Sequence, residues 1–134
     1  SHYLFETFRL LRRPDALFDR LDLWFGLLRD GLTTTIEMPE PTRSDCHAWG
    51  AHPLFHFHTT VLGVRPAAFG FRSVRIQPQL GPLQNAQGRL VHPSGGLIET
   101  RFERQNDALR GTITLPPTIT GTYIAPDGSE IPLH

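Results

Sequence analysis

The spacing of apolar residues changes near residue 66 and divides the chain into two kinds of structure. Before this point apolar residues recur every three or four positions, which is the spacing of a helix with one buried face. Beyond Arg65-Pro66 they alternate with polar residues, so that Ile98, Thr100 and Phe102 share one face of an expected strand. The sequence therefore predicts an α+β chain with two parts: helices over residues 1–65 and a small antiparallel β-sandwich over residues 66–134.

The helical part is expected to start with two antiparallel helices. Pro14-Asp15 suits the start of the second helix and Gly31 suits its end. A helix that is apolar over a wide arc belongs inside a larger assembly, because three helices alone cannot cover that surface. We therefore expect an apolar patch that other helices cover, or self-association of the separate chain. Its predicted members are Leu4, Phe8, Leu17, Leu21, Trp24 and Leu28.

A third helix is expected to end at Gly63, with Ser44 or Asp45 as its N-cap. Pro53 is unfavourable inside a helix, since it lacks an N–H group and clashes with the preceding turn. The sequence thus predicts either a short turn over residues 45–51 and a helix from about residue 53, or a kink at Pro53.

Turn residues separate the alternating runs of the second part. They occur at Pro93-Ser94-Gly95-Gly96, at Gln105-Asn106-Asp107 and at Pro126-Asp127-Gly128. Short strands joined in this way are typical of an antiparallel sandwich.

Composition excludes several kinds of partner. The 13 basic and 13 acidic residues leave no excess of positive charge for a nucleic acid or an anionic membrane. No stretch is apolar and long enough to span a bilayer. Cys46 is the single cysteine, which rules out an internal disulfide and leaves the cellular compartment open.

The segment Thr33–Gly63 carries the candidate functional residues. Glu37 lies between three threonines, which are stiff at χ1, and two prolines, Pro39 and Pro41, which fix φ. A loop of this composition holds a side chain in one direction. His47 and Trp49 follow near the start of the next helix, so an acid, a hydrogen-bonding ring and an apolar plate can line one concave site. Such a combination suits a sugar.

The same segment also offers a possible metal site. Its candidate ligands are Cys46, His47, His52, His56 and His58. His52 and His56 are one helical turn apart, as two zinc ligands can be, but the Glu that follows the first His in metalloproteases is absent and Pro53 disturbs the spacing. We therefore expect no metal.

Several of these motifs resemble the C-terminal end of family 78 glycoside hydrolases, the α-L-rhamnosidases. Residues 31–37, Gly-Leu-Thr-Thr-Thr-Ile-Glu, resemble the family's Gly-x-Thr-Thr-x-x-Glu loop, and residues 44–47, Ser-Asp-Cys-His, resemble its Ser-x-Asn-His segment. Residues 62–66 and 74–78 resemble the exit from the barrel and the first sandwich strand.

The resemblance implies the last helices of an (α/α)6 barrel followed by a β-sandwich, and an inverting hydrolase that acts on a rhamnose-containing glycoside. It makes Glu37 the general base and His47 a sugar contact, and it implies no cofactor. Cys46 departs from the family's Asn. The general acid lies earlier in such enzymes, so this chain would need the remainder of the barrel and is expected to be inactive alone.

Trp49 is either a core residue or a plate on which a sugar stacks. Two other functions also fit the sequence. One is a noncatalytic carbohydrate-binding or interdomain packing module, in which the site residues are relics. The other is a metal-binding regulatory domain.

Overall fold

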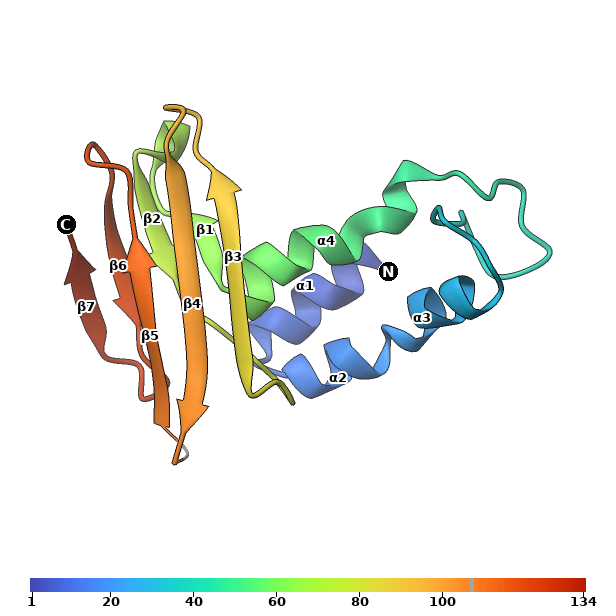
Figure 1. Cartoon of the computed structure of the whole chain (residues 1–134), viewed down its shortest axis with the longest axis horizontal. Helices are drawn as coiled ribbons and strands as arrows, with labels where there is room; N and C mark the ends of the chain where they lie inside the picture. Colours follow the sequence, from blue (N-terminus) through green and yellow to red (C-terminus); the bar gives the residue numbers. More distant parts are fainter. Residues whose placement is uncertain (107) are drawn as a thin grey trace. The chain divides into compact units, whose positions relative to one another are not determined.

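The computed structural model describes residues 1–106 and 108–134, which form two compact units, Ser1–His56 and Phe57–His134. The first is helical, and the second contains all the strands of the described residues (Figure 1). The predicted α+β class is therefore confirmed. Within the same residues, no helix combines the length and the apolar character needed to traverse a bilayer.

The helical unit contains four short helices and a 3₁₀ turn. Their bounds are α1 His2–Leu10, α2 Pro14–Asp19, α3 Asp22–Arg29, η1 Ala48–Ala51 and α4 His52–His56. The predicted second helix is thus broken in two. Around the break the backbone N–H groups of Arg20, Leu21 and Trp24 bond three residues back, to Leu17, Phe18 and Leu21. These bonds tighten the chain and end the α-helical ladder.

A small apolar core holds α1 and α2 together. Phe5, Leu17 and Leu21 are buried, and Phe8, Phe18 and Trp24 pack against them. The prediction that Leu17 and Leu21 belong to an exposed patch is wrong, because both side chains are buried with Phe5 in this core.

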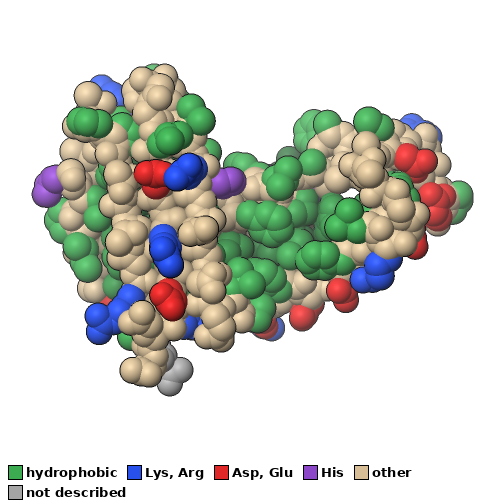
Figure 2. Space-filling model, in the orientation of Figure 1, with side chains coloured by type: hydrophobic (Ala, Val, Ile, Leu, Met, Phe, Trp, Pro, Cys, Tyr) green, Lys and Arg blue, Asp and Glu red, His purple; other side chains and the backbone are tan. Residues whose placement is uncertain are grey.

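The helical unit nevertheless leaves many large apolar side chains exposed, and Figure 2 shows hydrophobic side chains gathered on its visible face. Leu28 is 66% exposed, as predicted for the patch. Leu4 is also on the surface. The other exposed members of this unit are Tyr3, Leu10, Leu11, Leu23, Phe25, Met38, Trp49, Leu54 and Phe55.

The third helix begins later than predicted. His47, and not Ser44 or Asp45, takes the N-cap position of η1, and its side chain makes no capping bond. Of the two expected arrangements, the turn followed by a helix is the one found. Pro53 is tolerated because it lies in the first turn of α4, where its N–H would have no helical partner. A short π-helical segment, η2 Phe57–Val61, follows.

The second unit is a sandwich of two sheets (Figure 1). One sheet has the order β1-β2-β6-β7 and the other the order β3-β4-β5. The bounds are β1 Val64–Pro66, β2 Ser73–Ile76, β3 Asn85–Val91, β4 Leu97–Gln105, β5 Ala108–Thr114, β6 Thr120–Ile124 and β7 Glu130–Leu133, with a 3₁₀ turn η3 at Phe69–Phe71. Since β1 already pairs with β2, residues 74–78 are not the first sandwich strand.

One strand pair contradicts the expectation of a wholly antiparallel sandwich. β2 and β6 run parallel, with Ser73 opposite Thr120, whereas every other pair of described strands is antiparallel. Parallel neighbours need a long crossover. Here the crossover is the whole β3-β4-β5 sheet, so that β6 returns alongside β2 in the same direction.

The alternating apolar and polar residues of β4 determine which face of its sheet is buried. Ile98, Thr100 and Phe102 are all buried, as predicted, while Arg101 and Glu103 are exposed. Ile98 and Phe102 join the sandwich core, which also contains Leu62, Val64, Val74, Ile76, Leu80 and Ile119.

The turn predictions also hold where the structure describes them. Gly95, between β3 and β4, has a φ of 88°, and Gly128, between β6 and β7, has the same value. In the latter turn the Ser129 backbone N–H and hydroxyl both donate to Asp127 Oδ1. Asp107 of the third turn lies outside the described residues.

Candidate functional site

The chain between α3 and η1 forms a loop whose two arms are bonded to each other. The backbone N–H of Glu37 donates to the Ser44 carbonyl at 3.0 Å, and that of His47 donates to the Thr35 carbonyl at 2.7 Å. The Thr35 hydroxyl returns a bond to the His47 carbonyl at 2.7 Å. The loop thus brings Glu37 and His47 onto facing arms.

Two of the three threonines that precede Glu37 stiffen the loop through hydrogen bonds of their hydroxyl groups. Thr34 donates to the Asp45 carbonyl, and Thr35 donates to the His47 carbonyl. Both side chains therefore hold the loop closed, and they position Glu37 through the backbone.

Arg43 is the partner of the Glu37 carboxylate. Its guanidinium binds in a forked arrangement: Nε donates to Oε2 at 2.8 Å, and Nη2 donates to Oε1. The Arg43 bond is the main reason that the pKa of Glu37 lies below its usual range, and His47 adds a smaller attraction. Glu37 is consequently a carboxylate, and not a carboxylic acid, at neutral pH.

The base of the loop is tied to the neighbouring helices. The indole N–H of Trp24 in α3 donates to the Gly50 carbonyl in η1 at 2.7 Å. A Cβ on Gly50 would lie 2.6 Å from the Ile36 carbonyl oxygen, so only glycine lets η1 approach the loop this closely. Ile36 itself is buried. The residue before Glu37 is thereby anchored while the Glu37 side chain remains partly accessible.

Trp49 lies beside this loop and not in a core. It is 81% exposed and lines an open pocket of about 400 Å³ with five residues of α1, η1 and α4. These are His2, Ala48, Ala51, His52 and Phe55. Glu37 and His47 are not among the lining residues, so the structure brings Glu37 and His47 together and leaves Trp49 in an adjoining pocket.

The histidines of the metal alternative separate in the structure. His52 and His56 lie on α4, where they meet His2 of α1. Cys46 is exposed, and neither it nor His47 joins this group. Burial lowers the pKa of His52 to about 4, which leaves the ring uncharged at neutral pH.

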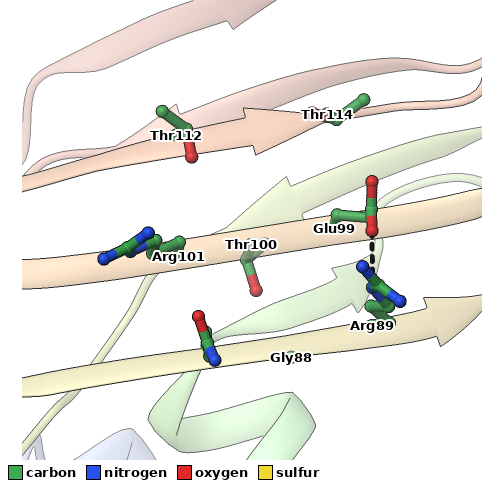
Figure 3. Close-up of a pocket in the computed structure, with 8 residues that line it drawn as sticks. Gly88, Arg89, Glu99, Thr100, Arg101, Thr112 and Thr114 are labelled. Atoms are coloured by element: carbon green, nitrogen blue, oxygen red, sulfur yellow. Dashed lines mark ion pairs between the residues drawn. The ribbon is translucent and has the colours of Figure 1, made fainter.

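A second pocket, which the sequence analysis did not foresee, lies on the β3-β4-β5 sheet (Figure 3). Its volume is about 500 Å³, and Arg89, Glu99, Arg101, Thr112 and Thr114 are among its lining residues. The one carboxylate of this lining, Glu99, is bound to Arg89 with a distance of 2.6 Å from Nε to Oε1. The polar residues that alternate with the buried ones predict a polar outer face for this sheet, but they do not indicate a pocket.

Comparison with known proteins shows which family has this architecture. The model of the bacterial α-L-rhamnosidase C-terminal domain matches residues 63–131, from Gly63 to Ile131. The chain belongs to this family.

Individual relatives agree with that assignment. An α-L-rhamnosidase from Alteromonas sp. (strain LOR) is 30% identical over 116 residues, which cover 77% of this chain and 12% of that enzyme. The crystal structure of a family 78 rhamnosidase from Bacillus sp. GL1 is 31% identical and superposes with a TM-score of 0.87, covering 96% of this chain and 15% of that one.

A more distant structure shares the fold. The α-L-rhamnosidase of Streptomyces avermitilis, solved with L-rhamnose, has 24% identity and a TM-score of 0.62, and the match covers 75% of this chain and 11% of that one. The chain thus spans about an eighth of the length of the rhamnosidases that it matches. The resemblance of the chain to the C-terminal part of family 78 rhamnosidases is confirmed.

Proposed function

We propose that this chain is part of an inverting glycoside hydrolase that removes terminal α-L-rhamnose from rhamnosides. Residues 1–65 supply the last helices of its (α/α)6 catalytic barrel, and residues 66–134 form its C-terminal sandwich. The observation that carries the proposal is the agreement with the Bacillus rhamnosidase over 96% of the chain. The anchored Glu37 loop supports it independently, because it holds an ionised carboxylate in an accessible position.

In this proposal Glu37 is the general base. An inverting glycosidase uses one carboxylate to activate water and a separate carboxylic acid to protonate the leaving oxygen, roughly 6.5–9.5 Å away. Arg43 lowers the pKa of Glu37 and so favours its ionised form, which suits the base and not the acid. The acid must come from another part of the barrel, so the chain alone is expected to be inactive. Acid–base chemistry of this kind needs no cofactor.

The exposed apolar residues of the helical unit fit the missing barrel helices. Leu10, Leu11 and Leu28 are each about two-thirds exposed, and Phe25 is 53% exposed. Figure 2 shows hydrophobic side chains gathered on the visible face of this unit, and exposed apolar side chains that gather in this way mark an interface. In the full-length enzyme other barrel helices cover it, and in the separate chain self-association does so.

His47→Ala is expected to raise KM and lower kcat in the full-length enzyme, with a loss of roughly tenfold in binding for each hydrogen bond to the sugar. The substitution removes only the ring, because both bonds of His47 to Thr35 involve its backbone. Steady-state kinetics and calorimetric titration with L-rhamnose measure the effect. Unchanged rhamnose affinity would show that His47 does not contact the sugar.

Arg43→Gln is expected to move the acidic limb of the pH–rate profile to higher pH. Arg43 lowers the pKa of Glu37, so the carboxylate stays charged to lower pH when Arg43 is present and becomes protonated earlier on acidification when it is absent. The profile of kcat/KM reports this shift.

Arg13→Gln is the matched control, because Arg13 forms a similar forked ion pair on the surface, with Nε donating to Asp15 Oδ1 and Nη2 donating to Asp15 Oδ2. An acidic limb that shifts equally in both variants, or in neither, would contradict the role given to Arg43.

A further inference from the structure

Three histidines that lie far apart in the sequence converge in the helical unit. His2 belongs to α1, whereas His52 and His56 occupy the two ends of α4. Each offers a ring nitrogen, and these three nitrogens all lie within 4.8 Å of one another. The residues and their neighbours belong to the same compact unit, Ser1–His56.

The spacing of the ring nitrogens suits one small cation. Zinc–nitrogen bonds of 2.0–2.1 Å in a tetrahedral site place two nitrogens about 3.3 Å apart. His56 Nε2 and His2 Nδ1 are already 3.1 Å apart. The three nitrogens all lie within 4.8 Å of one another, so the His52 nitrogen has to approach by no more than about 1.5 Å to complete the same geometry.

The rings are held in place by their surroundings. The His52 ring packs edge-on against Phe5 and Trp24, at centroid distances of 4.8 and 5.2 Å. His56 is fully buried against Phe5. Because the His52 and His56 rings are packed against these neighbours, they are largely oriented before an ion binds.

Two further observations support a bound cation. His52 Nδ1 is buried and has no hydrogen-bond partner among the described residues, an arrangement that is costly unless a ligand satisfies it. On the far side of His56, the Glu6 carboxylate lies 3.8 Å from Nδ1. A carboxylate in this position favours a proton on Nδ1 and leaves the Nε2 lone pair for a metal.

We propose that His2, His52 and His56 form a zinc-binding site. When the ion binds, the proton between His2 Nδ1 and His56 Nε2 moves to the other ring nitrogen of His2. The ion then accepts the lone pairs of three neutral imidazoles, so no oxidant or further reactant is needed. His2 and His52 also line the pocket of about 400 Å³ beside Trp49, which gives the ion a route of entry. Three histidines leave a fourth position of the tetrahedron for water or another small ligand. The site does not depend on the proposed role of Glu37.

Neither of the two sequence features that disfavour a metal excludes this site. Pro53 lies in the first turn of α4 and does not break the helical spacing between His52 and His56. The Glu that follows the first His in metalloproteases serves the peptidase reaction, so its absence after His52 does not prevent binding of the ion. The third ligand, His2, lies 50 positions before His52 and carried no sequence signal.

The test is a titration of the untagged, chelator-treated protein with Co²⁺, followed by displacement with Zn²⁺. We expect one Co²⁺ per chain, with the visible absorption of a four-coordinate ion, and loss of that spectrum on addition of Zn²⁺. His52→Phe and His2→Phe retain an aromatic ring and are expected to lower affinity by more than about 100-fold. Glu6→Gln is expected to lower it by about 10- to 100-fold, as for other partners of metal-bound histidines.

Circular dichroism of each variant separates ligand loss from unfolding, and for this reason the fully buried His56 is not the first choice for substitution. Cys46→Ser and His134→Ala are the controls, since both side chains are exposed and lie outside the cluster. Absence of stoichiometric binding to the folded protein would overturn the proposal. Equal affinity in the folded His52→Phe and His2→Phe variants would overturn it as well, and loss of binding in Cys46→Ser would place the ion elsewhere.

Discussion

In a full-length enzyme that contains this chain, Glu37→Gln is expected to lower kcat by about 10²- to 10⁴-fold, the usual effect of removing a general base. Gln preserves the size of the side chain and one oxygen acceptor for Arg43, so the loop should keep its form. The charge that activates water is lost. Because the base acts on water and not on the bound sugar, KM should change much less.

Glu40→Gln is the internal control for this substitution. Glu40 is an exposed acid of the same loop, and its carboxylate accepts a bond from the Thr42 backbone N–H, which a Gln oxygen can also accept. Near-normal turnover in Glu37→Gln, together with a large loss in Glu40→Gln, would mean that the base has been assigned to the wrong residue. Binding of rhamnose without turnover in the unsubstituted enzyme would instead favour a noncatalytic carbohydrate-binding module.

The fold class could be predicted from the sequence because the buried face of each helix or strand repeats its apolar residues at a fixed spacing. The alternation around Phe102 fixed the inward face of β4, and turn residues marked the ends of the strands. The parallel pairing of β2 with β6 left no such trace, since the hydrophobic pattern of a strand does not encode the direction of its neighbour. The break between α2 and α3 was missed for a similar reason: both sides of Leu21 keep helical spacing.

The candidate site was predictable where its parts are close in sequence. Thr35, Glu37 and His47 were found because the loop and the following turn are contiguous. Arg43 was overlooked, although it lies only six positions after Glu37, because a charged residue in a loop is usually solvated. The cluster around His56 could not be found in this way, since His2 reaches it only through the packing of α1 against α4.

A second large effect is expected at Gly63, where the family match begins. Gly63 has a φ of 73° and is buried, and its carbonyl accepts a bond from the Gln77 backbone N–H. A Cβ at this position would lie 2.1 Å from the Gln77 carbonyl carbon and oxygen. Since both groups are backbone, the clash cannot be relieved by a change of rotamer, and β1 must move away from β2.

Gly63→Ala is therefore expected to destabilise the sandwich by about 4 kcal/mol or more, in the range reserved for severe core disruption. Gly70→Ala isolates the backbone contribution, because Gly70 has a similar φ of 67° but nothing within 4 Å of the added carbon. The left-handed conformation alone should cost about 1–2 kcal/mol there. Denaturant unfolding followed by circular dichroism measures both values. If the two variants lost equal stability, the close approach of Gly63 to Gln77 would not be what requires glycine, and positive φ alone would account for it.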